Sequence, residues 1–98
     1  MIYKTKIAKD AKKEWDKLDG SIRKKFAKKL KERLENPRIP SAKLFGMDDC
    51  YKIKLRNDGY RLVYRVEDET ITVEVISVGK RDKSLIYKTT KKRLKSSG

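Results

Sequence analysis

The chain opens with a short strand that leads into an amphipathic helix. Tyr3, Thr5 and Ile7 alternate with lysines, and this period of two is typical of a short strand. Over residues 8–18 the apolar residues instead recur at spacings of three and four, which places them on one side of a helix. An Asp-Gly pair at residues 19–20 is predicted to end that helix.

A second helix follows directly and carries a strongly basic side. Ser21 is a suitable N-cap, and apolar residues recur every four positions from Ile22 to Leu34. The helix is predicted to end at Asn36, because the residue before a proline avoids the helical region of backbone space. Its exposed side holds many cations and few acids, the cations being Arg23, Lys24, Lys25, Lys28, Lys29, Lys31 and Arg33.

Three β-rich segments fill much of the second half, at residues 50–56, 60–66 and 70–78. A linker at residues 38–49 leads into the first of them. The connections between the three segments are so short that they permit only antiparallel hairpins. The pattern therefore predicts a three-stranded antiparallel meander.

A C-terminal helix is predicted for residues 83–95, after Gly79 has broken the last strand. Tyr87, Thr90 and Leu94 lie on one side of this helix. The complete pattern predicts an α+β fold made of an N-terminal strand, a helical hairpin, the meander and the C-terminal helix, with helices packed on one face of the sheet. At 98 residues the chain is expected to form a single domain spanning residues 1–98.

The net charge points to a polyanionic partner. Lys and Arg number 28 against 14 Asp and Glu, which gives a formal charge of +14, and the surplus is shared evenly between the two halves of the chain. A folded chain with this much self-repulsion is usually matched to a polyanion such as nucleic acid. A lysine-rich surface that serves only solubility is the simpler alternative.

Two absences narrow the chemistry. The chain has no histidine, which excludes Ser-His-Asp triads, Cys-His pairs and histidine-based zinc sites. Cys50 is the only cysteine and is predicted to be a small buried side chain, which fits a reducing cytoplasm. The sequence has no apolar run of 18 residues, and its start, MIYKTKIAKDAKKEW, has no apolar core of a signal peptide, so neither membrane spanning nor secretion is expected.

The first segment of the meander separates an apolar face from a basic one. Tyr51, Ile53 and Leu55 alternate with cations, so the two sets are predicted to lie on opposite faces of the sheet. The basic set consists of Lys52, Lys54 and Arg56. Like charges gathered on one face without acidic neighbours repel one another, and a bound phosphate would relieve that repulsion.

The register of the first hairpin decides which cations meet. A turn with an even number of residues places Lys54 opposite Arg61, whereas a three-residue turn with a bulge at Gly59 sends Arg61 to the other face. We favour the even turn. Arg81 and Tyr87 follow the third strand and can converge on the same side. A solvated sheet face whose lysines only prevent edge pairing remains the alternative.

Two stretches of the sequence resemble the RelE family of toxins. They are KLFGMDDCYKIKLRNDGYRLVYRVED at residues 43–68 and VISVGKRDKSLIY at residues 75–87, and the similarity extends over the whole chain. RelE toxins are ribosome-dependent mRNA interferases of toxin–antitoxin systems, which cut messenger RNA in the ribosomal A site. The resemblance implies a helical pair and a terminal helix on a small antiparallel sheet.

The resemblance also implies an active site and a reaction. The family's active-site positions match Lys52, Lys54, Arg61, Arg81 and Tyr87. The implied reaction is attack of a 2′-hydroxyl on the adjacent 3′ phosphate, which needs neither a metal nor a cofactor. We expect crowding by like charges to lower the lysine pKa values, and we assign Lys54, supported by Lys52, to proton transfer. Arg61 and Arg81 are assigned to the phosphate and Tyr87 to stacking on or orienting a base. Phe45 departs from the family, which often has arginine there.

The expected partners are the ribosome, through its RNA and the A-site mRNA, and an acidic RelB-type antitoxin. The candidate contacts to ribosomal RNA are Lys24, Lys25, Lys28, Lys29, Lys91, Lys92, Arg93 and Lys95. These positions are also consistent with solvated helix faces. Two other functions stay open: a ParE-like toxin that inhibits DNA gyrase without cutting RNA, and a non-catalytic RNA-binding protein.

Overall fold

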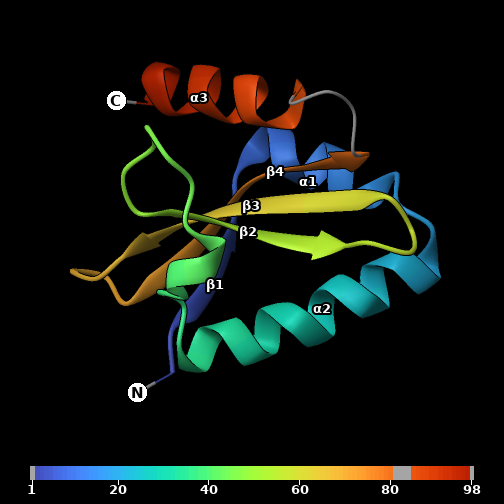
Figure 1. Ribbon diagram of the computed structural model, residues 1–98, viewed down its shortest axis with the longest axis horizontal. Helices are drawn as coiled ribbons and strands as arrows, with labels where there is room; N and C mark the ends of the chain where they lie inside the picture. Colours follow the sequence, from blue (N-terminus) through green and yellow to red (C-terminus); the bar gives the residue numbers. More distant parts are fainter. Residues whose placement is uncertain (1, 81–84, 98) are drawn as a thin grey trace.

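A four-stranded sheet flanked by helices forms the framework of the protein (Figure 1). The computed structural model describes residues 2–80 and 85–97. The elements are β1 (Lys4–Ile7), α1 (Lys9–Asp16), α2 (Gly20–Glu35), η1 (Pro40–Ala42, a short 3-10 helix), β2 (Cys50–Leu55), β3 (Tyr60–Glu67), β4 (Thr72–Lys80) and α3 (Leu85–Ser97). This order confirms the predicted α+β pattern of strand, helical hairpin, three further strands and terminal helix.

The sheet has the strand order β1-β4-β3-β2. Strands β2, β3 and β4 form the predicted antiparallel meander. Strand β1 adds to it in parallel beside β4, with Lys4 opposite Thr72 and Ile7 opposite Val75. Because α1, α2, η1, β2 and β3 all lie between β1 and β4 along the chain, no local pattern predicted this pairing.

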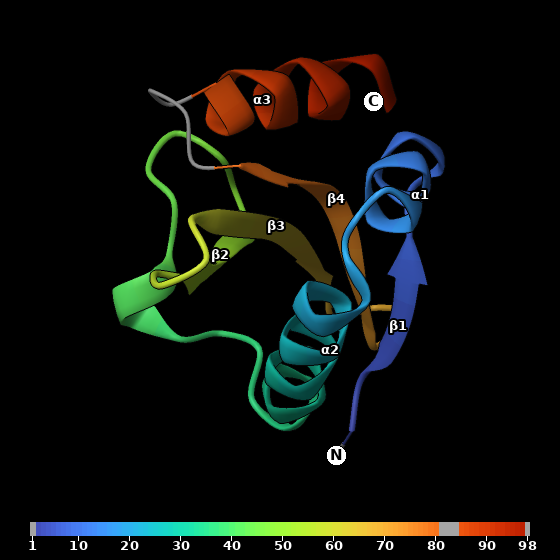
Figure 2. The ribbon, with the colours of Figure 1, turned by 90° about the vertical axis from the view of Figure 1, so that its right-hand side faces the viewer.

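Helices cover both faces of the sheet (Figure 2). On one face α1 and α2 pack against the strands in the main apolar cluster, where Phe26 and Ile53 are buried. On the opposite face α3 packs through a second cluster that includes Ile86 and Val63. The expectation that all helices pack on one face is therefore wrong. Residues 72–78 of β4 are buried throughout, so both faces of that strand need a cover.

Strand β2 shows the alternation that the sequence predicted. Its apolar side chains are buried in the main cluster, namely Tyr51, Ile53 and Leu55. Lys52 and Lys54 lie between them in sequence and are half-buried on the other face. Cys50 at the start of the strand is buried, as predicted, and burial raises the pKa of its thiol to about 11.

Several predicted boundaries are wrong, the first being the end of α1, which lies at Asp16 and not at the Asp-Gly pair. Helix α2 begins at Gly20 with Asp19 in the capping position, and Ser21 lies inside the first turn, where its hydroxyl donates to Asp19 Oδ2 at 2.6 Å. That hydrogen bond holds the pKa of Asp19 below its usual value. Gly79 does not break β4, because it still pairs with Arg61 and the strand runs on to Lys80. Glycine keeps both backbone hydrogen-bonding groups, so a ladder can pass through it.

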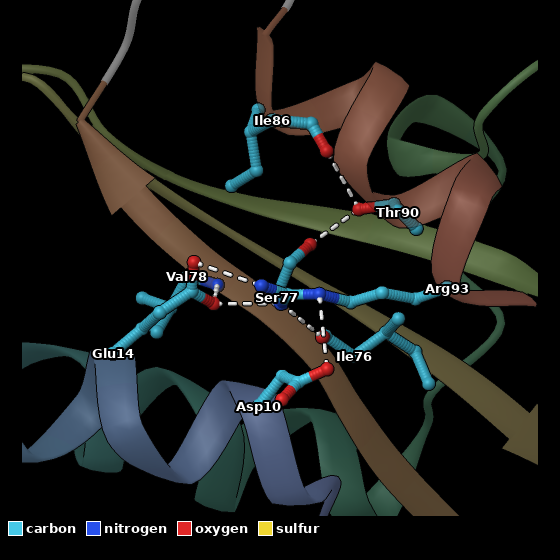
Figure 3. Close-up of polar contacts among 8 residues, drawn as sticks. All are labelled: Asp10, Glu14, Ile76, Ser77, Val78, Ile86, Thr90 and Arg93. Atoms are coloured by element: carbon cyan, nitrogen blue, oxygen red, sulfur yellow. Dashed lines mark hydrogen bonds and ion pairs between the residues drawn. The ribbon is translucent and has the colours of Figure 1, made fainter.

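The free edge of β4 is closed by an ion pair rather than by a strand (Figure 3). Strand β1 pairs with β4 only as far as Val75. Beyond that point the Val78 N–H donates to Glu14 Oε1 at 3.2 Å, and Arg93 Nη1 donates to the Ile76 carbonyl at 2.9 Å. The same guanidinium donates to both carboxylate oxygens of Glu14, at 2.8 and 3.2 Å. This pair therefore satisfies the open edge and joins α1 to α3.

A second polar contact fixes α3 on the sheet. The hydroxyls of Ser77 on β4 and Thr90 on α3 are hydrogen-bonded to each other, and both side chains are fully buried. The Thr90 hydroxyl also donates to the Ile86 carbonyl one turn earlier, at 2.8 Å. These contacts, with the Arg93 ion pair, set the position of α3 over the second face (Figure 3).

Candidate active site

The hairpin formed by β2 and β3 places two candidate cations side by side. Lys54 pairs directly with Arg61 across the ladder, which confirms the register favoured from the sequence. The connection is the four-residue turn 56–59, in which Gly59 has a φ of +72° that favours glycine. Lys52 lies two residues before Lys54 and therefore on the same face of β2.

Helix α3 brings Tyr87 to the same group of side chains. Arg61 Nη1 donates to the Tyr87 hydroxyl at 2.7 Å, and its guanidinium carbon lies 5.4 Å from the centre of the Tyr87 ring. Both contacts depend on α3 lying over the basic face of the sheet, which the one-sided packing expected from the sequence would not have allowed. The expected convergence of Tyr87 with the cations of the sheet is thus present, and the hydrogen bond to Tyr87 fixes the orientation of the Arg61 side chain.

Among the described residues, no neighbouring carboxylate neutralises the charges of this group. Within residues 2–80 and 85–97, no carboxylate lies within ion-pairing distance of Lys52, Lys54 or Arg61. The charge of Lys52 is the largest influence that lowers the pKa of Lys54, and partial burial and the charges of Arg61 and Arg56 act in the same direction. The expected effect of like-charge crowding is therefore present at Lys54. An anion bound here would remove the repulsion.

Two hollows open beside these side chains. One of about 270 Å³ is lined by residues of the hairpin, including Lys54 and Arg61. The other, of about 570 Å³, lies between the loop before β2 and α3, and both Lys52 and Tyr87 line it. The group is therefore open to a ligand from two sides, with space for a nucleotide and its phosphate.

Arg81 completes the set matched by the family resemblance, but it lies outside the described residues. The structure thus brings together Lys52, Lys54, Arg61 and Tyr87, and the assignment of Arg81 stays a prediction.

Arg33 supports the site from the other face, and the sequence reasoning missed it. It was counted among the cations of the exposed side of α2, yet its Nη1 donates to the Lys52 carbonyl at 3.1 Å and to the Tyr64 hydroxyl at 2.9 Å. The Tyr64 hydroxyl in turn donates to the Pro37 carbonyl at 2.7 Å. A signal was available, because Arg33 is three residues after Leu30 and so borders the apolar side of the helix. Arg33 thus holds the backbone of β2 at Lys52, whose side chain belongs to the site.

The basic side of α2 continues into the site. Lys24, Lys25, Lys28 and Lys29 are all exposed, as predicted, and Lys25 forms an ion pair with Asp58 at 2.8 Å. Three of these lysines line a hollow of about 550 Å³ together with Lys54. The cations of α2 and those of the hairpin therefore form one connected surface.

The cations of α3 do not share one environment. Lys91, Lys92 and Lys95 are exposed. Arg93 instead has only 22% of its side chain exposed and is held by Glu14 and the Ile76 carbonyl. Because its guanidinium is bonded to these groups within the fold, we do not include Arg93 among the candidate contacts to RNA.

Comparisons with known proteins agree on one family. The sequence model described as the ParE toxin of type II toxin–antitoxin systems, parDE, matches residues 5–85. The mRNA interferase toxin RelE of Escherichia coli (strain K12) is 54% identical over 94 residues, which cover 96% of this chain and 99% of that protein.

Solved structures give the same result. An E. coli RelE double mutant in the free state has a TM-score of 0.89 at 53% identity, covering 96% of this chain and 99% of that one. RelE in the intact E. coli RelBE toxin–antitoxin complex has a TM-score of 0.80 at 56% identity, covering 83% of this chain and 99% of that one. The likeness is thus close along the length of both chains.

Proposed function

This chain belongs to the RelE family of the RelE/ParE toxins, and from that membership we propose that it is a ribosome-dependent mRNA endoribonuclease that inhibits translation. The observation that carries the proposal is the group of Lys52, Lys54 and Arg61, which has no ion pair within the described part of the chain and has Tyr87 against it. A relative 54% identical over nearly the whole chain is named an mRNA interferase. The alternative of gyrase inhibition rests on the name of the matching sequence model alone.

The reaction is an internal transesterification in the A-site codon. The 2′-oxygen of one nucleotide attacks its own 3′ phosphorus, the bond from phosphorus to the next 5′-oxygen breaks, and a 2′,3′-cyclic phosphate remains. The 2′-hydroxyl loses a proton and the leaving oxygen gains one, so the site needs proton transfer and positive charge on the phosphate. The ribosome supplies the bent codon that places the attacking oxygen in line.

Each residue has an assigned role in this reaction. Lys54, with its lowered pKa, takes part in proton transfer with Lys52 beside it. Arg61 stabilises the phosphate, and its hydrogen bond to Tyr87 fixes its direction before the substrate arrives. Arg81 is assigned to the phosphate by the family resemblance, and Tyr87 stacks on or orients a base. No metal or cofactor is included in this mechanism.

The partners follow from the same family membership. E. coli RelE has been solved with RelB, and the partner of this chain is a RelB-type antitoxin that neutralises its basic surface. The exposed lysines of α2 and α3 face ribosomal RNA in this proposal. None of the helices in the described part of the chain is long and apolar enough to cross a membrane. We place the protein in the cytoplasm, where its ribosomal target lies, and take residues 1–98 as one toxin domain.

Ribosomes programmed with a defined mRNA test this proposal. With the protein added, we expect a cut within the A-site codon, and we expect an mRNA with a 2′-deoxy nucleotide at the cut position to stay intact because it lacks the nucleophile. Cleavage of the 2′-deoxy mRNA at the same position would refute the proposed reaction. Inhibition of DNA gyrase without any RNA cleavage would favour the ParE-like alternative.

A further inference from the structure

Phe45 is almost completely exposed to solvent. Its side chain is 99% exposed, more than Ile2 and Leu85, the other large apolar residues that are exposed in the described part of the chain. An exposed phenylalanine does not stabilise the fold, because its ring is not removed from water. The question is therefore what the ring meets when the protein acts.

The loop around Phe45 is firmly anchored. Leu44 and Met47, on either side of it, are only 7% and 9% exposed and belong to the second apolar cluster. The Leu44 N–H donates to the Cys50 carbonyl at 3.0 Å, which ties the loop to β2. Gly46, with a φ of +76°, allows the sharp turn between the two anchors. The chain thus holds Phe45 outward from a fixed base, which reduces the entropy that a binding partner has to overcome.

The ring lies at the candidate active site. Phe45, Lys52 and Tyr87 line the same hollow of about 570 Å³, together with Lys43. The loop that carries Phe45 rises beside α3 in both views of the ribbon (Figures 1 and 2). The hollow thus combines two aromatic rings with two lysines, and one carboxylate, that of Asp48, also lines it. A nucleotide matches this combination, because its base has two apolar faces and its phosphate is an anion.

We propose that Phe45 is a base-stacking residue, whose ring packs on a nucleobase of the mRNA next to the scissile phosphate. The proposal rests on the proposed ribonuclease function and adds a positioning contact to it. Because a phenyl ring carries no charge, this contact holds the RNA without reading its sequence and without depending on salt.

A double-mutant cycle between protein and RNA tests the stacking contact. The protein variants are Phe45→Leu, which keeps an apolar side chain without a ring, and Phe45→Trp, which keeps a ring. The RNA variants carry an abasic nucleotide at one codon position at a time. On programmed ribosomes, Phe45→Leu is expected to lower kcat/KM by about 5- to 150-fold, the range typical of one base–aromatic stack, whereas Phe45→Trp stays near the wild type.

The abasic substitution identifies the stacked base. On RNA with the abasic nucleotide at that position, wild type and Phe45→Leu should have about the same kcat/KM, so the two changes together cost little more than either one alone. Losses that multiply at every position, or a Phe45→Leu variant as active as the wild type, would overturn the proposal. A Phe45→Leu variant that cleaves normally but binds the antitoxin more weakly would assign the ring to the antitoxin and likewise overturn it.

The result with the wild-type protein distinguishes a failure of this inference from a failure of the proposed function. A wild-type protein that leaves ribosome-bound mRNA intact refutes the ribonuclease itself, whereas cleavage that is insensitive to Phe45 refutes only the stacking contact. Thermal unfolding of each variant serves as the control, and because Phe45 is exposed we expect midpoints close to the wild type.

Discussion

Replacing Arg93 with alanine is expected to destabilise the protein and loosen α3 over the site. The change removes the guanidinium donor from the Ile76 carbonyl and from the Glu14 carboxylate, which keeps the Val78 N–H but loses its cation. The Arg93 and Glu14 side chains are 22% and 34% exposed, so the pair is intermediate between surface and buried. Exposed pairs contribute about 0–1 kcal/mol and breaking buried pairs costs about 3–5 kcal/mol, so we expect a loss of about 2 kcal/mol.

For a domain of this size that loss lowers the thermal midpoint by about 8–16 °C. Circular dichroism during heating measures it, and Lys95→Ala, which removes an exposed cation from the same helix, is the matched control with an expected change below about 0.5 kcal/mol. Arg93→Lys should retain part of the stability, since the ammonium keeps the charge but lacks the planar fork with which the guanidinium bonds both oxygens of Glu14. Cleavage should also slow in Arg93→Ala, because α3 carries Tyr87. Equal midpoints for Arg93→Ala and Lys95→Ala would refute the assigned role of the ion pair.

Three other perturbations test the site and its surroundings. Arg61→Ala should lower the single-turnover cleavage rate on ribosomes by about 10²–10³-fold while the protein stays folded, and near-full activity would contradict its assignment to the phosphate. Lys54→Met should abolish cleavage yet raise the thermal midpoint at neutral pH. The sign follows from the lowered pKa of Lys54. The folded state binds the proton of Lys54 more weakly than the unfolded state does, so protonated Lys54 costs stability at neutral pH. This cost disappears as the pH rises, first through the pKa of the folded state and then through that of the unfolded state. Equal thermal midpoints for the wild type and Lys54→Met would contradict the proposed repulsion between Lys54 and the neighbouring cations. Finally, Lys28→Gln and Lys29→Gln should each reduce the slope of log affinity for ribosomes against log salt by about 0.7–0.9, and an unchanged slope would exclude these lysines from the RNA contact.

Local patterns in the sequence were sufficient for the elements and for half of the site. The alternation in β2 placed Lys52 and Lys54 on one face, and a short even turn placed Arg61 opposite Lys54. Both inferences need only the period of a strand and the length of a turn. They concern residues within about ten positions of one another, where backbone geometry decides the contact.

Contacts between distant segments could not be predicted in this way. The pairing of β1 with β4 and the packing of α3 on the second face depend on the whole chain, and the meeting of Tyr87 with Arg61 depends on that packing. Arg33 and Arg93 look like their exposed neighbours in sequence, because charge alone does not indicate whether an acceptor lies within reach. Sequence reasoning therefore overestimated the cations available to RNA and missed two that hold the site in place.

The chemical nature of the new RNA ends tests the central claim most directly. After programmed ribosomes are incubated with the protein, the upstream fragment is isolated and its 3′ terminus identified by mass spectrometry, with Arg61→Ala as the control. The account predicts a 2′,3′-cyclic phosphate on a fragment that ends within the A-site codon, absent with the variant. A 3′-hydroxyl terminus, or mRNA that remains intact with the wild-type protein, would contradict it.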